Sequence, residues 1–200
     1  MSAAPGCDDS DVDIRSRQLL LDGFFRVEQV TLSHRRLDGR MSQPLQRLHL
    51  DRGDGAALLL HDPVRQTIFL VRQFRFATWE QGPGWLLETV AGVVESDRTP
   101  AEVARQEAWE EAGFRLDDLE PVSTFYLTPG GSSERIFLFY AAVDATMRQA
   151  PGGGLEAEGE DIEVVEMPLE QAWDALDTGR LCDAKTIIAL QWLRQRQATR

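Results

Sequence analysis

The sequence predicts an α/β fold of the α+β type, a sandwich in which a mixed sheet lies between helices and a β-hairpin lobe precedes it. Three observations predict this fold. Short apolar, strand-like segments are spread between residues 24 and 165, one strongly marked helix interrupts them, and two helical segments close the chain. We therefore expect a mobile tail over residues 1–13, a β lobe over 14–54 and a main domain over 55–200.

The lobe is predicted from a strand-like pattern between Gly23 and Leu50. Apolar residues up to Leu32 lead into a turn over residues 37–40 (LDGR), and a second strand follows over 45–50. Because this hairpin precedes the main apolar strands, we expect it to form a separate lobe.

In the main domain, six apolar segments are predicted to be strands, namely 56–60, 67–72, 85–90, 122–127, 136–143 and 162–165. The glycine-rich and acidic stretch 151–161 is expected to be a mobile loop. Of the two closing helices, the first carries apolar residues at i, i+3, i+4 and i+7 from Leu169, and the second starts at Asp183.

Composition excludes several classes of protein. A net charge of -12 argues against nucleic-acid binding, which needs a basic surface. No uncharged apolar run approaches the roughly 20 residues that span a bilayer, and no signal-peptide pattern opens the chain. The two cysteines, Cys7 and Cys182, have no paired spacing, so a cytoplasmic protein without a disulfide framework is expected.

The marked helix carries three glutamates on one side. Residues 99–102 (TPAE) combine a capping box with proline at the first helical position, and Gly113 is a natural stop. Glu107, Glu110 and Glu111 are three or four residues apart, so we expect them on one exposed helix face. A divalent cation such as Mg²⁺, which prefers oxygen ligands, would remove their mutual repulsion. On spacing alone, however, such a set is most often a solvated surface.

The wider string changes this interpretation. Residues 92–95 (GVVE) and 106–114 (QEAWEEAGF) resemble the Nudix box. That pattern is a glycine, five residues, a glutamate, seven residues, then Arg-Glu-apolar-any-Glu-Glu-any-Gly-apolar. Two positions depart from it, since Arg98 stands for the first glutamate and Gln106 for the arginine. In the family that arginine pairs with a neighbouring glutamate, whereas Gln106 can offer only a neutral hydrogen bond, roughly half as strong as a charge-assisted one.

Further strings resemble the ADP-ribose pyrophosphatase branch of the Nudix family. They are 71–75 (VRQFR), 85–92 (WLLETVAG), 128–135 (TPGGSSER) and 158–162 (EGEDI). The same strings also resemble GDP-mannose hydrolases, so the base and the sugar stay open. The resemblance implies Mg²⁺-dependent hydrolysis of a nucleoside diphosphate sugar, with ADP-ribose first, and Mn²⁺ as a possible substitute for Mg²⁺. The number of metal ions stays open.

The resemblance also implies a role for each of several residues. The metal would be bound by the Ala91 carbonyl and by Glu107, Glu111 and Glu160. Glu158 would be the general base, and Glu110 would bind a metal or hold water. The remaining residues would bind substrate, with arginines at the phosphates and phenylalanines beside the base: Phe24, Phe25, Arg47, Arg75, Val93, Thr128 and Glu134.

Each outer residue also has a plainer explanation. Surface charge explains Arg75, Glu158 and Glu160, a bare turn explains Thr128, and packing explains Val93 and the phenylalanines. Two other functions stay open, a Nudix-fold nucleotide sensor without catalysis and a purely structural acidic domain. The related family exchanges its lobe between two subunits, which implies a homodimer in which Phe24 or Arg47 reaches the partner's site.

Overall fold

The chain folds into two compact units, seen here in a computed structural model that describes residues 8–199, except for the side chains of Asp9, Ala145 and Glu158. One unit comprises the residues up to Arg52 together with Thr128–Glu134. The other comprises Gly53–Leu127 and the residues from Arg135 onward. Segment 128–134 therefore belongs to the first unit although it lies within the sequence of the second.

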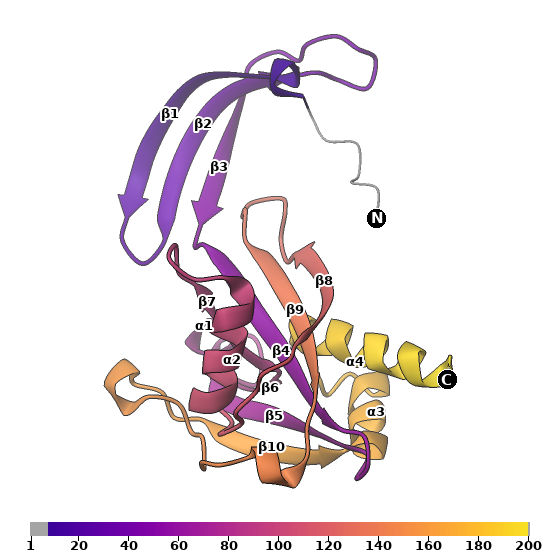
Figure 1. Cartoon of the computed structure of the whole chain (residues 1–200). Coiled ribbons are helices and arrows are strands. Elements are labelled where there is room, and N and C mark those ends of the chain that lie inside the picture. Colours follow the sequence, from indigo (N-terminus) through magenta and orange to yellow (C-terminus); the bar gives the residue numbers. More distant parts are fainter. Residues whose placement is uncertain (1–7, 200) are drawn as a thin grey trace. The chain divides into compact units, whose positions relative to one another are not determined.

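The first unit is a three-stranded antiparallel sheet (Figure 1). A 3-10 turn, Asp9–Asp11, leads into β1 (Val12–Asp22), β2 (Arg26–His34) and β3 (Leu45–Asp51), and β2 is the central strand. The sequence did not predict β1, and Val12 and Asp13, expected in the tail, belong to it. Every residue of β1 is exposed, so the strand has no buried side from which an alternating pattern could arise.

The second unit is built on a mixed sheet of seven strands. Five follow the order β10-β5-β4-β9-β8, with β6 paired to β5 and β7 paired to β4. Only β4 and β9 pair in parallel; the other pairs are antiparallel. The strands are β4 (Asp54–Asp62), β5 (Thr67–Phe74), β6 (Trp85–Glu88), β7 (Val90–Val94), β8 (Glu120–Tyr126), β9 (Arg135–Ala142) and β10 (Glu163–Pro168).

One expected strand, 85–90, is in fact two. β6 pairs with β5 and β7 pairs with β4, and the chain changes partner at Thr89. The Thr89 N–H is bonded to Thr186 Oγ1 at 2.7 Å. A side chain from the last helix thus takes the place of a sheet partner at this residue.

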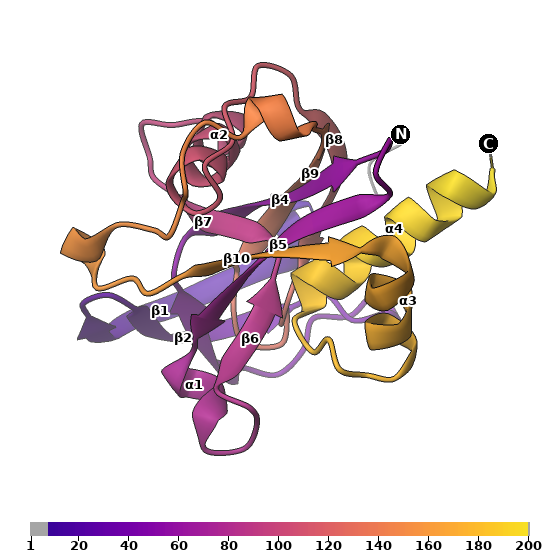
Figure 2. The same ribbon diagram turned by 90° about the horizontal axis from the view of Figure 1, so that it is seen from below.

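Helices cover both faces of the sheet (Figure 2). Alternate residues of β4 belong to two separate cores, because successive side chains of a strand point to opposite faces. Leu58 lies in the core beneath α2 (Pro100–Glu110), and Leu59 lies in the core beneath α3 (Leu169–Asp177) and α4 (Ala184–Ala198). The predicted α/β/α sandwich is confirmed. The sequence missed the single turn α1 (Phe76–Trp79), which is too short to show a helical period.

The ends of α2 follow the predicted signals. Thr99 and Glu102 form the capping box, and Pro100 begins the helix. At the other end Gly113 has φ +76, and a Cβ there would lie 1.9 Å from the Ala150 carbonyl oxygen. Loop 151–161 therefore passes directly against this helix end, where the N–H of Gly153 bonds Glu111 O at 2.9 Å.

No helix among residues 8–199 combines the length and the apolar character needed to cross a membrane.

Candidate functional site

The end of α2 is pressed onto β7 by two of its glutamates. A Cβ on Gly92 would lie 1.9 Å from Glu107 Oε1, so only glycine leaves room for this carboxylate. Glu111 accepts a hydrogen bond from the Ala91 N–H at 3.1 Å. The sequence expected Glu111 on an exposed helix face, and that was wrong: it is the C-cap residue and only 2% exposed. Helical spacing cannot reveal this, because β7 covers the helix end from a distant part of the chain.

The buried Glu111 lies in a negative field. Burial, together with the charges of Glu107 and Glu160, raises the pKa of the Glu111 carboxyl to about 8. The Ala91 N–H and the Arg75 guanidinium oppose this increase. Glu160 is carried by loop 151–161, where it accepts a hydrogen bond from the Leu155 N–H at 2.8 Å. The structure therefore brings three of the predicted metal ligands within electrostatic reach of one another.

This donor set fits a divalent cation. A buried carboxylate with two acidic neighbours is costly unless a cation balances it, and hard cations prefer carboxylate and carbonyl oxygens. Among the described residues, however, no group of three acidic, histidine or cysteine side chains is already close enough together to hold an ion. Side chains such as Glu160 would have to turn toward the ion to complete its coordination.

Glu110 has a partner on its own helix. The Gln106 amide donates through Nε2 to Glu110 Oε1 at 2.9 Å, one turn apart. Glu158 lies in the 3-10 turn Glu156–Glu158 of the acidic loop, but its side chain falls outside the described part of the chain. Its assignment as general base stays a prediction.

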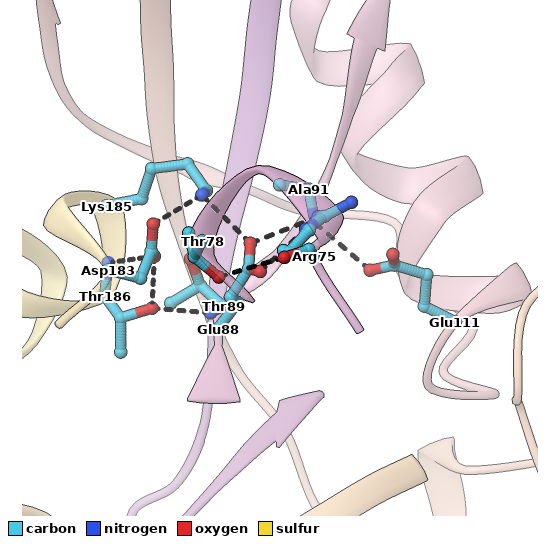
Figure 3. Close-up of polar contacts among 9 residues, drawn as sticks. All are labelled: Arg75, Thr78, Glu88, Thr89, Ala91, Glu111, Asp183, Lys185 and Thr186. Atoms are coloured by element: carbon cyan, nitrogen blue, oxygen red, sulfur yellow. Dashed lines mark hydrogen bonds and ion pairs between the residues drawn. The ribbon is translucent and has the colours of Figure 1, made fainter. Parts of the chain in front are cut away.

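On the other side of β7, a network of charged side chains fixes Arg75 (Figure 3). Arg75 binds Glu88 twice, through Nε at 2.8 Å and Nη2 at 3.2 Å. Lys185 reaches the same carboxylate at 3.1 Å and Asp183 at 2.7 Å. Asp183 also caps α4 by accepting from Thr186 N and Oγ1. Two cations and two carboxylates thus join the N-cap of α1, the end of β6 and the start of α4.

The network keeps Arg75 charged and within electrostatic reach of Glu111. Burial alone would lower the pKa of Arg75, but its bonds to Glu88 and the charges of Glu88, Glu111 and Asp183 raise it above the ordinary value. The side chain keeps 41% of its exposure, against 3% for Glu88. A cation that is held from one side and open on the other is suited to bind an anionic group.

The sequence reasoning missed Glu88, Asp183 and Lys185. A signal existed for two of them. Glu88 is a lone carboxylate at the end of the apolar string WLLE, and Asp183 directly precedes a helix, where aspartate is a favoured cap. Neither signal shows which residue the carboxylate contacts. Glu88 and Lys185, for example, are 97 residues apart in the sequence.

The remaining predicted residues lie mostly in the first unit. Phe24 and Phe25 sit between β1 and β2, 82% and 40% exposed, with their rings 4.9 Å apart edge to face. Arg47 is exposed on β3. Thr128 is exposed at the start of segment 128–134, and Glu134 is buried at its end, 3.4 Å from Arg52. In the second unit, Val93 is 44% exposed beside Gly92 on β7.

Comparison with known proteins shows which sequences this chain is similar to. The NUDIX domain model matches residues 51–190. The ADP-ribose pyrophosphatase of Escherichia coli (strain K12) is 40% identical over 186 residues, which cover 92% of this chain and 88% of that protein. The GDP-mannose pyrophosphatase of Pectobacterium atrosepticum is 39% identical over 184 residues, 91% of this chain and 93% of that protein. The GDP-mannose pyrophosphatase of Enterobacter sp. (strain 638) is 37% identical over 185 residues, which cover 92% of this chain and 95% of that protein.

The buried Glu111 predicts an unusual pH dependence of stability in metal-free protein. Its pKa is about 8 when the chain is folded and near the ordinary value of 4.5 when it is unfolded, so between these two pH values the folded chain holds an extra proton. The contribution of Glu111 to the unfolding free energy should therefore fall as pH rises through this window, by up to about 1.4 kcal/mol per pH unit. Denaturant titrations with EDTA should show a weaker pH dependence for Glu111→Gln, and equal slopes for variant and wild type would contradict the assignment.

Removal of Lys185 should destabilise the fold. Lys185→Met leaves Glu88 and Asp183, both nearly buried, with one cation fewer, and breaking a buried pair costs on the order of 3 kcal/mol. Arg180→Met is the matched control, because the Arg180–Asp174 pair is exposed and should contribute under about 1 kcal/mol. Urea denaturation measures both, and similar losses in the two variants would argue against a buried network.

Proposed function

The chain belongs to the Nudix family, and from this membership we propose that it hydrolyses the pyrophosphate bond of a nucleoside diphosphate sugar. The first substrate is ADP-ribose, which gives AMP and ribose 5-phosphate. GDP-mannose is the second candidate, since relatives of both names match at similar identity. The observation that carries the proposal is the buried Glu111 with Glu107 and Glu160 beside it and Arg75 opposite.

Mg²⁺ is the proposed metal, with Mn²⁺ as a substitute, held by the carboxylates of Glu107, Glu111 and Glu160 and by the Ala91 carbonyl. When bound, it would neutralise charge on the pyrophosphate and lower the pKa of water. Glu110 accepts a hydrogen bond from Gln106 one turn away and directly precedes Glu111 in the chain, and it would bind a metal or hold water.

The chain's own residues supply binding and proton transfer. Arg75, fixed by Glu88, would bind a phosphate oxygen through its open side. Glu158 would accept a proton from the attacking water. The oxygen of that water bonds to phosphorus while the bond between phosphorus and the bridging oxygen breaks. Its position in a glycine-rich loop suits a base that closes over bound substrate. Val93 would line the same pocket.

The first unit would complete the site as part of a homodimer. Phe24 and Phe25 would contact the base, with Arg47, Thr128 and Glu134 at the phosphates and sugar. The proposed partner is a second copy of this chain, because β1 is an edge strand with exposed apolar side chains: Ile14, Leu19, Leu20 and Leu21. Exchange of the N-terminal lobe, residues 14–54, between subunits belongs to the same proposal. The exposed free thiol of Cys182 suits a cytoplasmic location.

Substrate and metal are tested together. AMP release from ADP-ribose and GMP release from GDP-mannose should both be measured with Mg²⁺, with Mn²⁺ and with EDTA. Turnover should require the metal and be faster with ADP-ribose. Glu111→Gln should lower kcat by more than the roughly 100-fold that loss of a supporting residue can cost, whereas Glu170→Gln, on α3 across the sheet, should not. No turnover with any nucleoside diphosphate sugar would favour a sensor.

The proposed base has its own test. Glu158→Gln should lower kcat by about 10²- to 10⁴-fold with little change in KM, because general-base catalysis acts in the transition state. Glu156→Gln, an exposed glutamate in the same turn, is the matched control and should keep wild-type kcat. If both variants turn over equally, the base lies elsewhere.

A further inference from the structure

The two residues that depart from the Nudix pattern contact each other. Arg98 lies just before the N-cap of α2, and its Nη1 donates a hydrogen bond to Gln106 Oε1. Gln106 in turn donates through Nε2 to Glu110 Oε1 at 2.9 Å. A guanidinium, an amide and a carboxylate therefore form one continuous chain of hydrogen bonds along α2.

This contact changes the meaning of the departures. The pattern has an acid at position 98 and a cation at position 106, and this sequence has a cation at 98 and a neutral amide at 106. Taken one at a time, each substitution removes a charge that the pattern supplies. Taken together, they keep one positive charge in the pair and move it from the helix to the preceding loop.

The polarity of the amide explains why the pair works only together. A guanidinium can only donate and a carboxylate can only accept, so an amide between them has one favourable orientation. With Oε1 toward Arg98, Nε2 faces Glu110; the reverse orientation would set oxygen against oxygen and NH₂ against the guanidinium. Without Arg98 this preference would rest on Glu110 alone.

The charge of Arg98 also reaches Glu110 through the amide. A charged donor at Oε1 polarises the amide and strengthens the N–H bond that the other end donates. Arg98 has a second acidic neighbour, Glu95, but only at 3.9 Å and with 65% of that side chain exposed. Capping of α2 is supplied by Thr99 and Glu102, so it does not need Arg98.

We propose that Arg98 and Gln106 are positioning residues that act as one relay, with Arg98 orienting the Gln106 amide and the amide holding the Glu110 carboxylate beside Glu107 and Glu111. The relay replaces the direct ion pair of the family pattern by a charge acting through one amide. Its consequence for catalysis rests on the proposed function, whereas the relay itself can be observed without turnover.

A double-mutant cycle tests the relay. Arg98→Met and Gln106→Met each break one link, so each should lower kcat about tenfold, with KM within about twofold. The double variant should lose no more than either single variant, because the second change removes a link that is already broken. Arg105→Met is the matched control, since Arg105 bonds the carbonyls of Asp117 and Ala101 and should leave kcat unchanged.

Rescue gives a second readout. Arg98→Lys keeps a charged donor and should retain most of the kcat. Arg98→Glu alone should be worse than Arg98→Met, because the amide would then turn its oxygen toward Glu110. Arg98→Glu combined with Gln106→Arg restores the family pattern and should recover kcat to within about threefold of wild type. Two outcomes would overturn the relay. In one, the losses of kcat in Arg98→Met and Gln106→Met multiply in the double variant; in the other, Arg98→Met has the same kcat as Arg105→Met.

A spectroscopic measurement separates failure of the relay from failure of the proposed function. In the metal-free protein, the side-chain NH₂ resonances of Gln106 should shift in Arg98→Met and in Glu110→Gln but not in Arg105→Met. Such shifts support the relay even if wild type turns over no nucleoside diphosphate sugar. If the Gln106 resonances shift in neither Arg98→Met nor Glu110→Gln, the relay is overturned, whatever activity the protein has.

Discussion

The contact between the end of α2 and β7 is the constraint on which the rest of the second unit depends. Two carboxylates are pressed onto one short strand, Glu107 over Gly92 and Glu111 at the Ala91 N–H. Such a contact is unfavourable for stability alone, because burial keeps Glu111 away from water beside other acids. A cation bound there, as proposed, would offset this cost, while the packing of the sandwich keeps the two carboxylates in place.

The polar residues around this contact divide into a negative and a positive side. Loop 151–161 brings Glu160 to the end of α2, where Gly113 and the following glycines let it pass close to the helix. From the other direction, Glu88 and Lys185 fix Arg75. The change of strand partner at Thr89 lies between these sides, and its N–H is satisfied by α4. Under the proposed function, an acidic chain would thus hold both a cation and a phosphate in one site.

The departures from the Nudix pattern show how a local rule can fail while the arrangement survives. When the helix is considered alone, a glutamine in place of the arginine predicts a weaker bond from residue 106 to its neighbouring glutamate. Arg98 lies eight residues earlier, yet the loop before α2 returns it to the same helix face. The meaning of position 106 therefore depends on position 98.

Much of this protein is determined by its sequence. Apolar runs predicted the strands of the main sheet, apart from the division of 85–90 into β6 and β7. The capping box, Pro100 and Gly113 predicted α2 to within a residue or two, because these signals act over a few residues. The pattern through Glu107 and Glu111 identified the family, since its spacing sets which carboxylates face the sheet. Only the tertiary structure decided that Glu111 is buried, that β6 and β7 are separate strands, and that Lys185 and Asp183 hold Arg75 through Glu88. Those outcomes depend on contacts between segments that are far apart in the chain. The spacing of neighbouring residues cannot specify which distant segment will cover a charged side chain and exclude water from it.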